Sequence, residues 1–314
     1  MLILISLFSA IIPIFIYLVL LWYFDKNERE SFILVFVNFL WGAFGSIVVA
    51  LIVSILFSLP LNLTGLSKHV ANFYQTVIVA PFVEEFAKGV FLFIIVITND
   101  FDNLTDGLVY GGAIGLGFGM TENFLYYISF ASTVNQLIYL FFLRTLFTVF
   151  IHLFATGAFG AFLALAKFSN KKNKIFLIIA GYLTAVFIHL IWNLSVTLNL
   201  GIIFSFVYML SVFTIFIFTF SKSLKNEKKI ISEELKEEIL FNNITEGQFS
   251  FIFGKNKLSA DRKLKSMLRK SAVKLAFSKH KFKNKNITNK KKYEQDILIY
   301  RSRLKSYLNE LTLL

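Results

Sequence analysis

Glutamate and histidine residues occur inside long apolar stretches of this chain. The segment VIVAPFVEEFAKGVFLFIIVI (77–97) carries Glu84, Glu85 and Lys88. The strongly polar residues of three later apolar stretches are Glu122 and Asn123, then Arg144, His152 and Thr156, then His189 and Asn193. A charged side chain at bilayer depth costs about 2.5–3.5 kcal/mol even on the lenient insertion scale, so such residues usually face a protein interior or a wet cavity and have a function there. Carboxylates and imidazoles can transfer protons or bind a metal ion.

The spacing of these residues favours one shared site. Glu84 and Lys88 are four residues apart, as are His189 and Asn193, so each pair lies on one helix face. Four consecutive apolar stretches contribute polar residues, whereas the first, second and last carry no charge in their central parts. We therefore expect the four stretches to bring their polar side chains together.

The composition of the chain places these stretches in a membrane. The 314 residues are 56% hydrophobic and have a mean hydropathy of +0.68, which is too apolar for a soluble domain of this size. There is no cysteine, which excludes disulfides and thiolate chemistry. About 20 residues cross the hydrocarbon core. We expect an all-α, polytopic transmembrane helix bundle of about seven spans, placed near 2–24, 33–58, 73–97, 107–130, 137–166, 175–197 and 199–220.

Glycines in the fourth stretch indicate close helix packing. Gly107, Gly111, Gly115 and Gly119 recur every four residues, and such faces let transmembrane backbones approach one another. The run lacks the preceding strand and the lysine of a phosphate-binding loop, so we interpret these glycines as structural.

The distribution of basic residues predicts the orientation. The loops 25–32 and 167–174 and everything after residue 221 are basic, whereas the loops 59–72 and 131–136 carry only Lys68. Basic loops stay inside, so with seven spans the N-terminus is outside and the C-terminus cytoplasmic. We expect two domains, a transmembrane domain over 1–221 and a short basic helical tail over 222–314.

The tail holds all the excess charge of the chain. Residues 222–314 contain 23 of the 32 Lys and Arg and 10 of the 19 Asp and Glu, a net charge of +13, and the rest is neutral. Three of its stretches have helical apolar spacing: SEELKEEILF, DRKLKSMLRKSAVKLAFSKHKF and YEQDILIYRSRLKSYLNELTLL. Contact with anionic lipid contributes about 1 kcal/mol per basic residue near the surface. A solvated helical appendage is an equal alternative. No motif indicates nucleic-acid binding, and none is expected.

Four sequence blocks carry a family resemblance. APFVEEFAKG, DGLVYGGAIGLGFGMTEN, HLFATGAFG and HLIWN follow one another on successive stretches within residues 75–200. In this order they resemble the PrsW family of bacterial intramembrane proteases, which is grouped with CAAX prenyl endopeptidases and bacteriocin-processing membrane proteins. The resemblance implies hydrolysis of a peptide bond in a single-span or anti-sigma-type membrane protein, in the bacterial cell membrane.

The resemblance also implies roles for individual residues. The glutamate pair of the family corresponds to Glu84 and Glu85, its second acid to Glu122, and its histidines to His152 and His189. Asn193 matches the final asparagine and could donate to the oxyanion of amide hydrolysis. The wider CAAX-endopeptidase pattern has arginine one position after Lys88 and histidine where this chain has Glu122.

Two mechanisms and two other classes of function stay open. Glu84, His152 and His189, with Glu122, could hold a zinc ion that lowers the pKa of a bound water, although the HExxH motif is absent. Alternatively, Glu84 and a histidine activate water without a metal. A proton- or metal-coupled transporter also uses buried Glu and His, but we find no internal repeat of the kind that many transporters have. A non-enzymatic immunity or scaffold protein is the remaining alternative.

Overall fold

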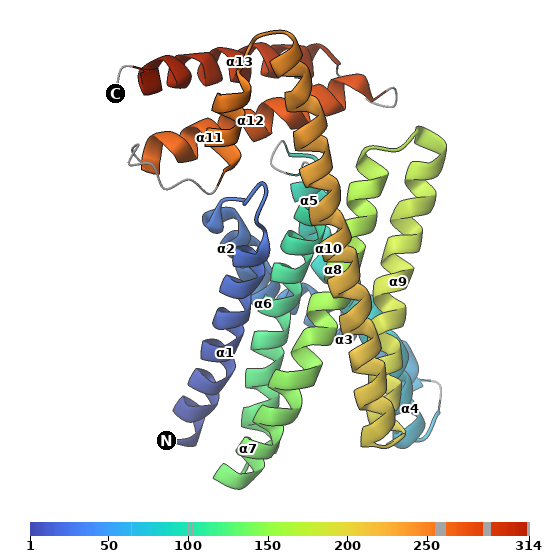
Figure 1. Cartoon of the computed structure of the whole chain (residues 1–314). Coiled ribbons are helices and arrows are strands. Elements are labelled where there is room, and N and C mark those ends of the chain that lie inside the picture. Colours follow the sequence, from blue (N-terminus) through green and yellow to red (C-terminus); the bar gives the residue numbers. More distant parts are fainter. Residues whose placement is uncertain (64, 99–100, 102, 255–261, 285–289, 313–314) are drawn as a thin grey trace. The chain divides into compact units, whose positions relative to one another are not determined.

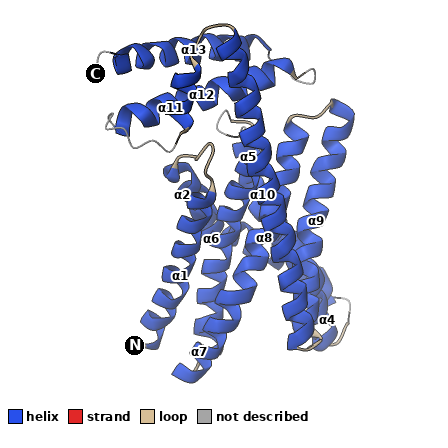
Figure 2. Cartoon of the chain, viewed as in Figure 1, coloured by secondary structure: helices blue, strands red, loops and turns tan. Residues whose placement is uncertain are grey.

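The chain is built from helices. The computed structural model describes residues 1–63, 65–98, 101, 103–254, 262–284 and 290–312, and these contain helices and no strand (Figure 2). This confirms the predicted all-α class. The helices form two compact units, one of Met1–Asp25 with Arg29–Ser221 and one of Lys26–Glu28 with Lys222–Leu314. We name them the membrane unit and the tail unit.

The membrane unit consists of long helical segments, three of which contain a short π-helix, labelled η (Figure 1). In chain order the elements are α1 (Leu2–Phe24); α2 (Phe32–Leu40), η1 (Trp41–Ser46) and α3 (Ile47–Leu63); α4 (Lys68–Tyr74), η2 (Gln75–Val79) and α5 (Ala80–Val96); α6 (Leu104–Phe130); α7 (Val134–Leu143), η3 (Arg144–Thr148) and α8 (Val149–Lys167); α9 (Lys171–Thr197); and α10 (Ile202–Leu240).

Within the described part of the chain, five helical segments are long and apolar enough to cross a membrane. They are Leu2–Phe24, Phe32–Ser58, Val134–Lys167, Lys172–Thr197 and Ile202–Leu240. The polytopic bundle is thus confirmed, whereas the count of seven spans is not. The other two long helical segments of the membrane unit are not among these five. They contain α5 and α6, which carry Glu84, Glu85, Lys88 and Glu122. From Thr105 to Gly119, α6 is buried on every side, so protein rather than lipid surrounds most of this helix.

Glycines determine how α6 meets α8. A Cβ added at Gly107, Gly111 or Gly115 would overlap the backbone of Gly160, Thr156 or His152 respectively. The glycine face predicted from the sequence therefore packs directly against α8. Because Gly115 lies against the backbone of His152, this contact also fixes the position of that histidine along α6.

The three π-helices receive side-chain bonds from neighbouring helices. Thr121 of α6 donates to the carbonyl of Ala43 in η1 (2.7 Å), and Asn193 of α9 donates to the carbonyl of Thr76 in η2 (2.9 Å). The hydroxyl groups of Tyr127 in α6 and Thr145 in η3 lie 3.0 Å apart. π-Helical turns occur often at functional sites.

The tail unit has a hydrophobic core of its own. It comprises the end of α10 with α11 (Glu246–Phe253), α12 (Arg262–Lys283) and α13 (Lys290–Thr312). Leu235 of α10, Leu268 and Ala276 of α12 and Leu304 of α13 are buried in one cluster. The stretch SEELKEEILF is the end of α10, which continues without a break from the last apolar stretch. Residues 255–261, 285–289 and 313–314, which belong to the predicted tail, lie outside the described residues.

The tail unit also includes Lys26–Glu28, the middle of the loop between α1 and α2. The Asn27 side chain donates to the carbonyl of Leu224 (2.8 Å), and Lys274 of α12 pairs with Glu28 (2.8 Å). This loop and the tail therefore belong to one unit, and both are basic regions in the sequence.

Candidate active site

The site is built around a buried ion pair on α5. Lys88 and Glu85 are both fully buried, and the Lys88 Nζ donates to the Glu85 Oε1 at 2.7 Å. Thr156 of α8 donates to the other carboxylate oxygen of Glu85 (2.9 Å). The Lys88 Nζ also lies 4.0 Å from the centre of the Phe118 ring. These contacts compensate for the burial of both charges.

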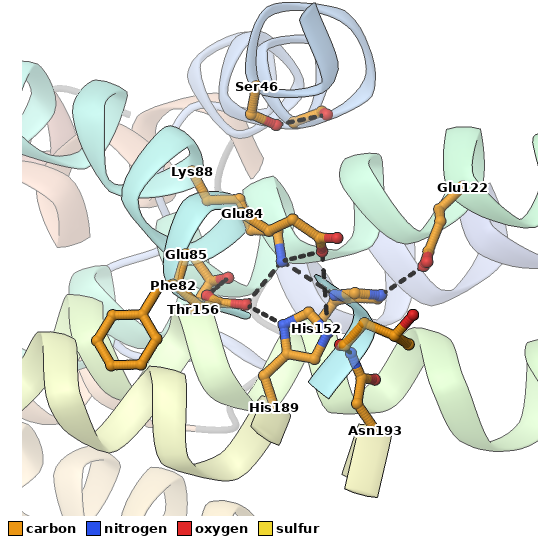
Figure 3. Close-up of polar contacts among 12 residues, drawn as sticks. Ser46, Phe82, Glu84, Glu85, Lys88, Glu122, His152, Thr156, His189 and Asn193 are labelled. Atoms are coloured by element: carbon orange, nitrogen blue, oxygen red, sulfur yellow. Dashed lines mark hydrogen bonds and ion pairs between the residues drawn. The ribbon is translucent and has the colours of Figure 1, made fainter. Parts of the chain in front are cut away.

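His189 and Glu84 face each other beside this pair (Figure 3). The Nδ1 of His189 lies 3.0 Å from the Glu85 Oε1, so it donates to this carboxylate and leaves the Nε2 with a free lone pair. The Nε2 lies 3.8 Å from the Glu84 Oε2, which is also 3.8 Å from the Lys88 Nζ. This Glu84 oxygen is buried and has no hydrogen-bond partner among the described residues.

His152 occupies the space between α5, α6 and α9. Its Nδ1 lies 3.0 Å from the Lys88 Nζ, and its Nε2 lies 2.7 Å from the Glu122 Oε2. An ammonium group can only donate, so with Lys88 charged the Nδ1 accepts and the Nε2–H donates to Glu122. The rings of His152 and His189 are perpendicular, with their centroids 4.8 Å apart.

A cavity of about 440 Å³ opens beside these residues. Glu84, Glu122, His152, His189 and Asn193 all line it. Arg144, also named in the sequence analysis, lines it as well, and the rest of the wall includes residues that the sequence analysis did not select, among them Gln75, Thr76, Tyr126, Phe130, Leu140, Leu143 and Trp192. The apolar and aromatic members do not differ in type from other residues of apolar helices, whereas Gln75, a polar residue in the stretch 73–97, was a signal that the sequence analysis missed.

The structure brings the predicted site residues together, although not all in the same way. Glu84, His152 and His189 each offer one ligand atom, and these atoms lie within 4.8 Å of one another. Glu122 stands outside this group, because its Oε2 is paired with Arg144 (2.7 Å) as well as with His152. The amide of Asn193 points to the carbonyl of Thr76 in η2, so it lies at the cavity wall.

The residues present fit a metal ion. The donor set of one carboxylate and two imidazoles is of the kind that holds catalytic zinc, and an oxygen of Glu84 is left without a hydrogen bond. The Glu85–His189 bond is the carboxylate–histidine arrangement that orients metal ligands. For His152 to be a ligand, one of its two nitrogens must give up its contact with Lys88 or Glu122.

A comparison with known protein families assigns the chain to one of them. The family described as PrsW family intramembrane metalloprotease matches residues 30–219, which is more than half of the chain. The chain belongs to this family. The PrsW match includes every residue of the cavity and contains neither of the two segments of the tail unit, Lys26–Glu28 and Lys222–Leu314.

Two relatives named Protease PrsW are similar to this PrsW-family chain. The one from Clostridioides difficile (strain 630) is 26% identical over 236 residues, which cover 73% of this chain and 95% of the relative. The one from Geobacillus kaustophilus (strain HTA426) is 32% identical over 115 residues, 36% of this chain and 48% of the relative. No solved structure matches the chain. The family and its relatives are proteases, so the chain is a peptidase and an integral membrane protein.

Proposed function

We propose that this chain is an intramembrane endopeptidase that cleaves a single-span or anti-sigma-type membrane protein, with zinc held by Glu84, His152 and His189. The observation that supports this most is the Glu84 oxygen that is buried beside His189 without a hydrogen bond. A buried polar atom without a partner costs free energy, and a bound group would satisfy it. The bacterial cell membrane with a cytoplasmic tail is the proposed location, and the tail charge favours anionic lipid there.

The residues of the site divide the work of amide hydrolysis. Where Glu84 does not hold a metal ion, its carboxylate takes a proton from the attacking water, whose oxygen bonds to the carbonyl carbon of the substrate. The same carboxyl group then returns a proton to the leaving amine as the C–N bond breaks. Asn193 lines the cavity and is a donor for the oxyanion, and a histidine becomes a second donor when it is protonated.

The other charged groups keep these residues in place. Glu85 orients His189, and Lys88 with Thr156 fixes Glu85. When bound, zinc would lower the pKa of a water ligand and polarise the substrate carbonyl. Glu84, His152 and His189 would hold it.

A metal-free glutamate mechanism is the second candidate. It is favoured by the two contacts of His152, whose Nδ1 meets the Lys88 ammonium and whose Nε2 meets Glu122. In that state His152 has no free nitrogen for a metal. Glu84 would then activate water with His189 alone.

The test combines metal analysis with cleavage of a single-span substrate by purified, detergent-solubilised protein. We expect about one zinc ion per chain in the wild type and much less in Glu84→Gln and His189→Asn. Removal of the metal by a chelator should abolish cleavage, and added zinc should restore it. Full cleavage by metal-free protein would select the metal-free mechanism instead. Full cleavage by Glu84→Gln would falsify the assignment of this site to proteolysis.

A further inference from the structure

Arg144 is held in one orientation by three contacts. It is the first residue of η3, and only 7% of its surface is exposed. Its Nη2 lies 2.7 Å from the Glu122 Oε2, and its Nε donates to the Asn123 Oδ1 at 2.9 Å. The guanidinium carbon lies 3.6 Å from the centre of the Tyr126 ring. The guanidinium thereby forms an ion pair with one residue of α6 and a hydrogen bond with the next.

The glutamate that Arg144 binds is a direct partner of the site. The Glu122 Oε2 that meets Arg144 also lies 2.7 Å from the Nε2 of His152. One carboxylate oxygen thus links the guanidinium to the imidazole. Arg144 itself also lines the cavity, but a guanidinium offers no lone pair to a metal ion.

Glu122 needs this partner to keep its position. It lies near the end of a glycine-rich helix and faces the cavity, with 19% of its side chain exposed. Without the guanidinium, the side-chain contact left to Glu122 among the described residues would be the bond from His152, and the carboxylate could turn into the cavity. The ring of His152 would then lose the bond that fixes its Nε2 side.

From this geometry we propose that Arg144 is a positioning residue of the protease, which acts through Glu122 to hold the His152 ring in its working orientation. The proposal rests on the proposed function of the site. The proposal also gives the π-helix η3 a role. This turn contains Arg144 and leads directly into α8, the helix that carries His152. A misplacement of about 1 Å in a catalytic group can lower a rate by two orders of magnitude.

Thr145 provides a matched control. It is the next residue of η3, it is buried, and its hydroxyl bonds Tyr127 of α6. Both residues therefore fasten η3 to α6, but Thr145 has no contact with Glu122 among the bonds of the described residues. A purely structural role for Arg144 would make the Arg144 and Thr145 variants behave alike.

The experiment measures folded yield, kcat and KM for cleavage of a single-span substrate by the full-length protein. We expect Arg144→Gln to lower kcat by about 10- to 100-fold, as losses of residues that orient ligands do, with KM and yield near wild type. Thr145→Val should keep kcat within about twofold, given that it removes no contact of the site. Arg144→Lys should restore only part of kcat, because one ammonium cannot bond Glu122 and Asn123 in the same geometry.

Several results would overturn the proposal. An unchanged kcat in Arg144→Gln would do so, as would a raised KM with normal kcat, which would place Arg144 in direct contact with substrate. Equal losses of yield in Arg144→Gln and Thr145→Val, with normal kcat of the folded fraction, would make the residue structural. If Arg144→Gln does not fold, Asn123→Ala removes only the Nε bond and should still lower kcat. Glu84→Gln serves as the reference, because its full activity would defeat the proposed function rather than this inference.

Discussion

Among the described residues, each unit contains a cluster of glutamates close to lysine or arginine. In the tail unit, the Glu238 side chain is fully buried, and both of its oxygens are bonded by Arg301 (2.7 and 2.8 Å). Lys279 (2.7 Å) and Asn243 (2.9 Å) bond the same carboxylate. In the membrane unit, the Glu84 Oε2 lies 3.8 Å from both the Lys88 Nζ and the His189 Nε2, and it has no hydrogen bond among the described residues.

The difference separates a structural carboxylate from a reactive one. Every oxygen of Glu238 is occupied by a donor, so the group has no capacity left for a ligand or a proton in transit. Glu85 resembles Glu238 in this respect, since Lys88, His189 and Thr156 all bond it. Glu84 alone of these three keeps an unused oxygen and also lines the cavity. Residue type is the same in all three positions, and the number of bonds distinguishes them.

The largest effect should come from removing the charge of Glu84. We expect Glu84→Gln to reduce cleavage by about 10³-fold or more, because it removes the base while keeping the volume of the side chain. Folded yield should stay close to wild type, since no hydrogen bond to its buried oxygen is lost. Cleavage per folded molecule and monodispersity in detergent would be measured together, with Glu238→Gln as the matched comparison. Equal activity losses in the two variants would remove the distinction drawn between them.

Much of this site could be predicted from the sequence, because helix spacing and membrane depth constrain where polar residues can lie. Four polar stretches on consecutive apolar segments indicated a shared site, and Glu84, His152 and His189 do converge. The predicted glycine face of α6 does approach the backbone of α8. Both predictions follow from periodicity along single helices.

Partner choice between helices could not be predicted. Spacing paired Lys88 with Glu84, but the shorter bond goes to Glu85, whose other contacts, Thr156 and His189, come from two different helices. The π-helical turns also have no pattern in a uniformly apolar sequence. In the tail, amphipathic spacing does not distinguish a solvated helix from a packed one, and the buried core of the tail unit appeared only in the structure.

The second-largest effect is expected on the stability of the tail unit. Replacing Glu238 by Gln leaves Lys279 and Arg301 without their shared carboxylate, and breaking a buried ion pair in this way costs about 3 kcal/mol. Hydrogen–deuterium exchange on the full-length protein should show faster exchange in α12 and α13, with cleavage by the membrane unit retained. Arg301→Lys is the control, because it keeps the charge but loses the paired bonds to Glu238. Unchanged protection in Glu238→Gln would mean that this cluster does not stabilise the tail.

A smaller effect is expected on mild acidification. Bonds from His280, Lys283, Lys279 and Arg301 hold the pKa values of Glu234, Glu237 and Glu238 below their ordinary value, against the opposing effect of burial. A lowered pKa in the folded state contributes stability above the unfolded pKa, about 4.3, and this stability is lost as the pH falls through the folded pKa. Exchange protection of α12 and α13 should therefore stay level from neutral pH to about 5 and decline only below about 4. A decline that begins near pH 6 would point to groups other than these carboxylates.

The smallest effect should come from an ion pair of the same chemistry at the surface of α10. Lys229 and Glu233 lie 3.8 Å apart at four-residue spacing, but their side chains are 70% and 63% exposed. Water screens such a pair, and holding two long side chains together costs entropy, so it contributes under about 0.5 kcal/mol. Glu233→Gln should therefore leave the exchange of α12 and α13 almost unchanged, whereas Glu238→Gln in the same helix accelerates it. The two variants change the same residue type, so a loss of protection as large in Glu233→Gln would show that net charge, rather than the number of bonds to a buried carboxylate, stabilises the tail unit.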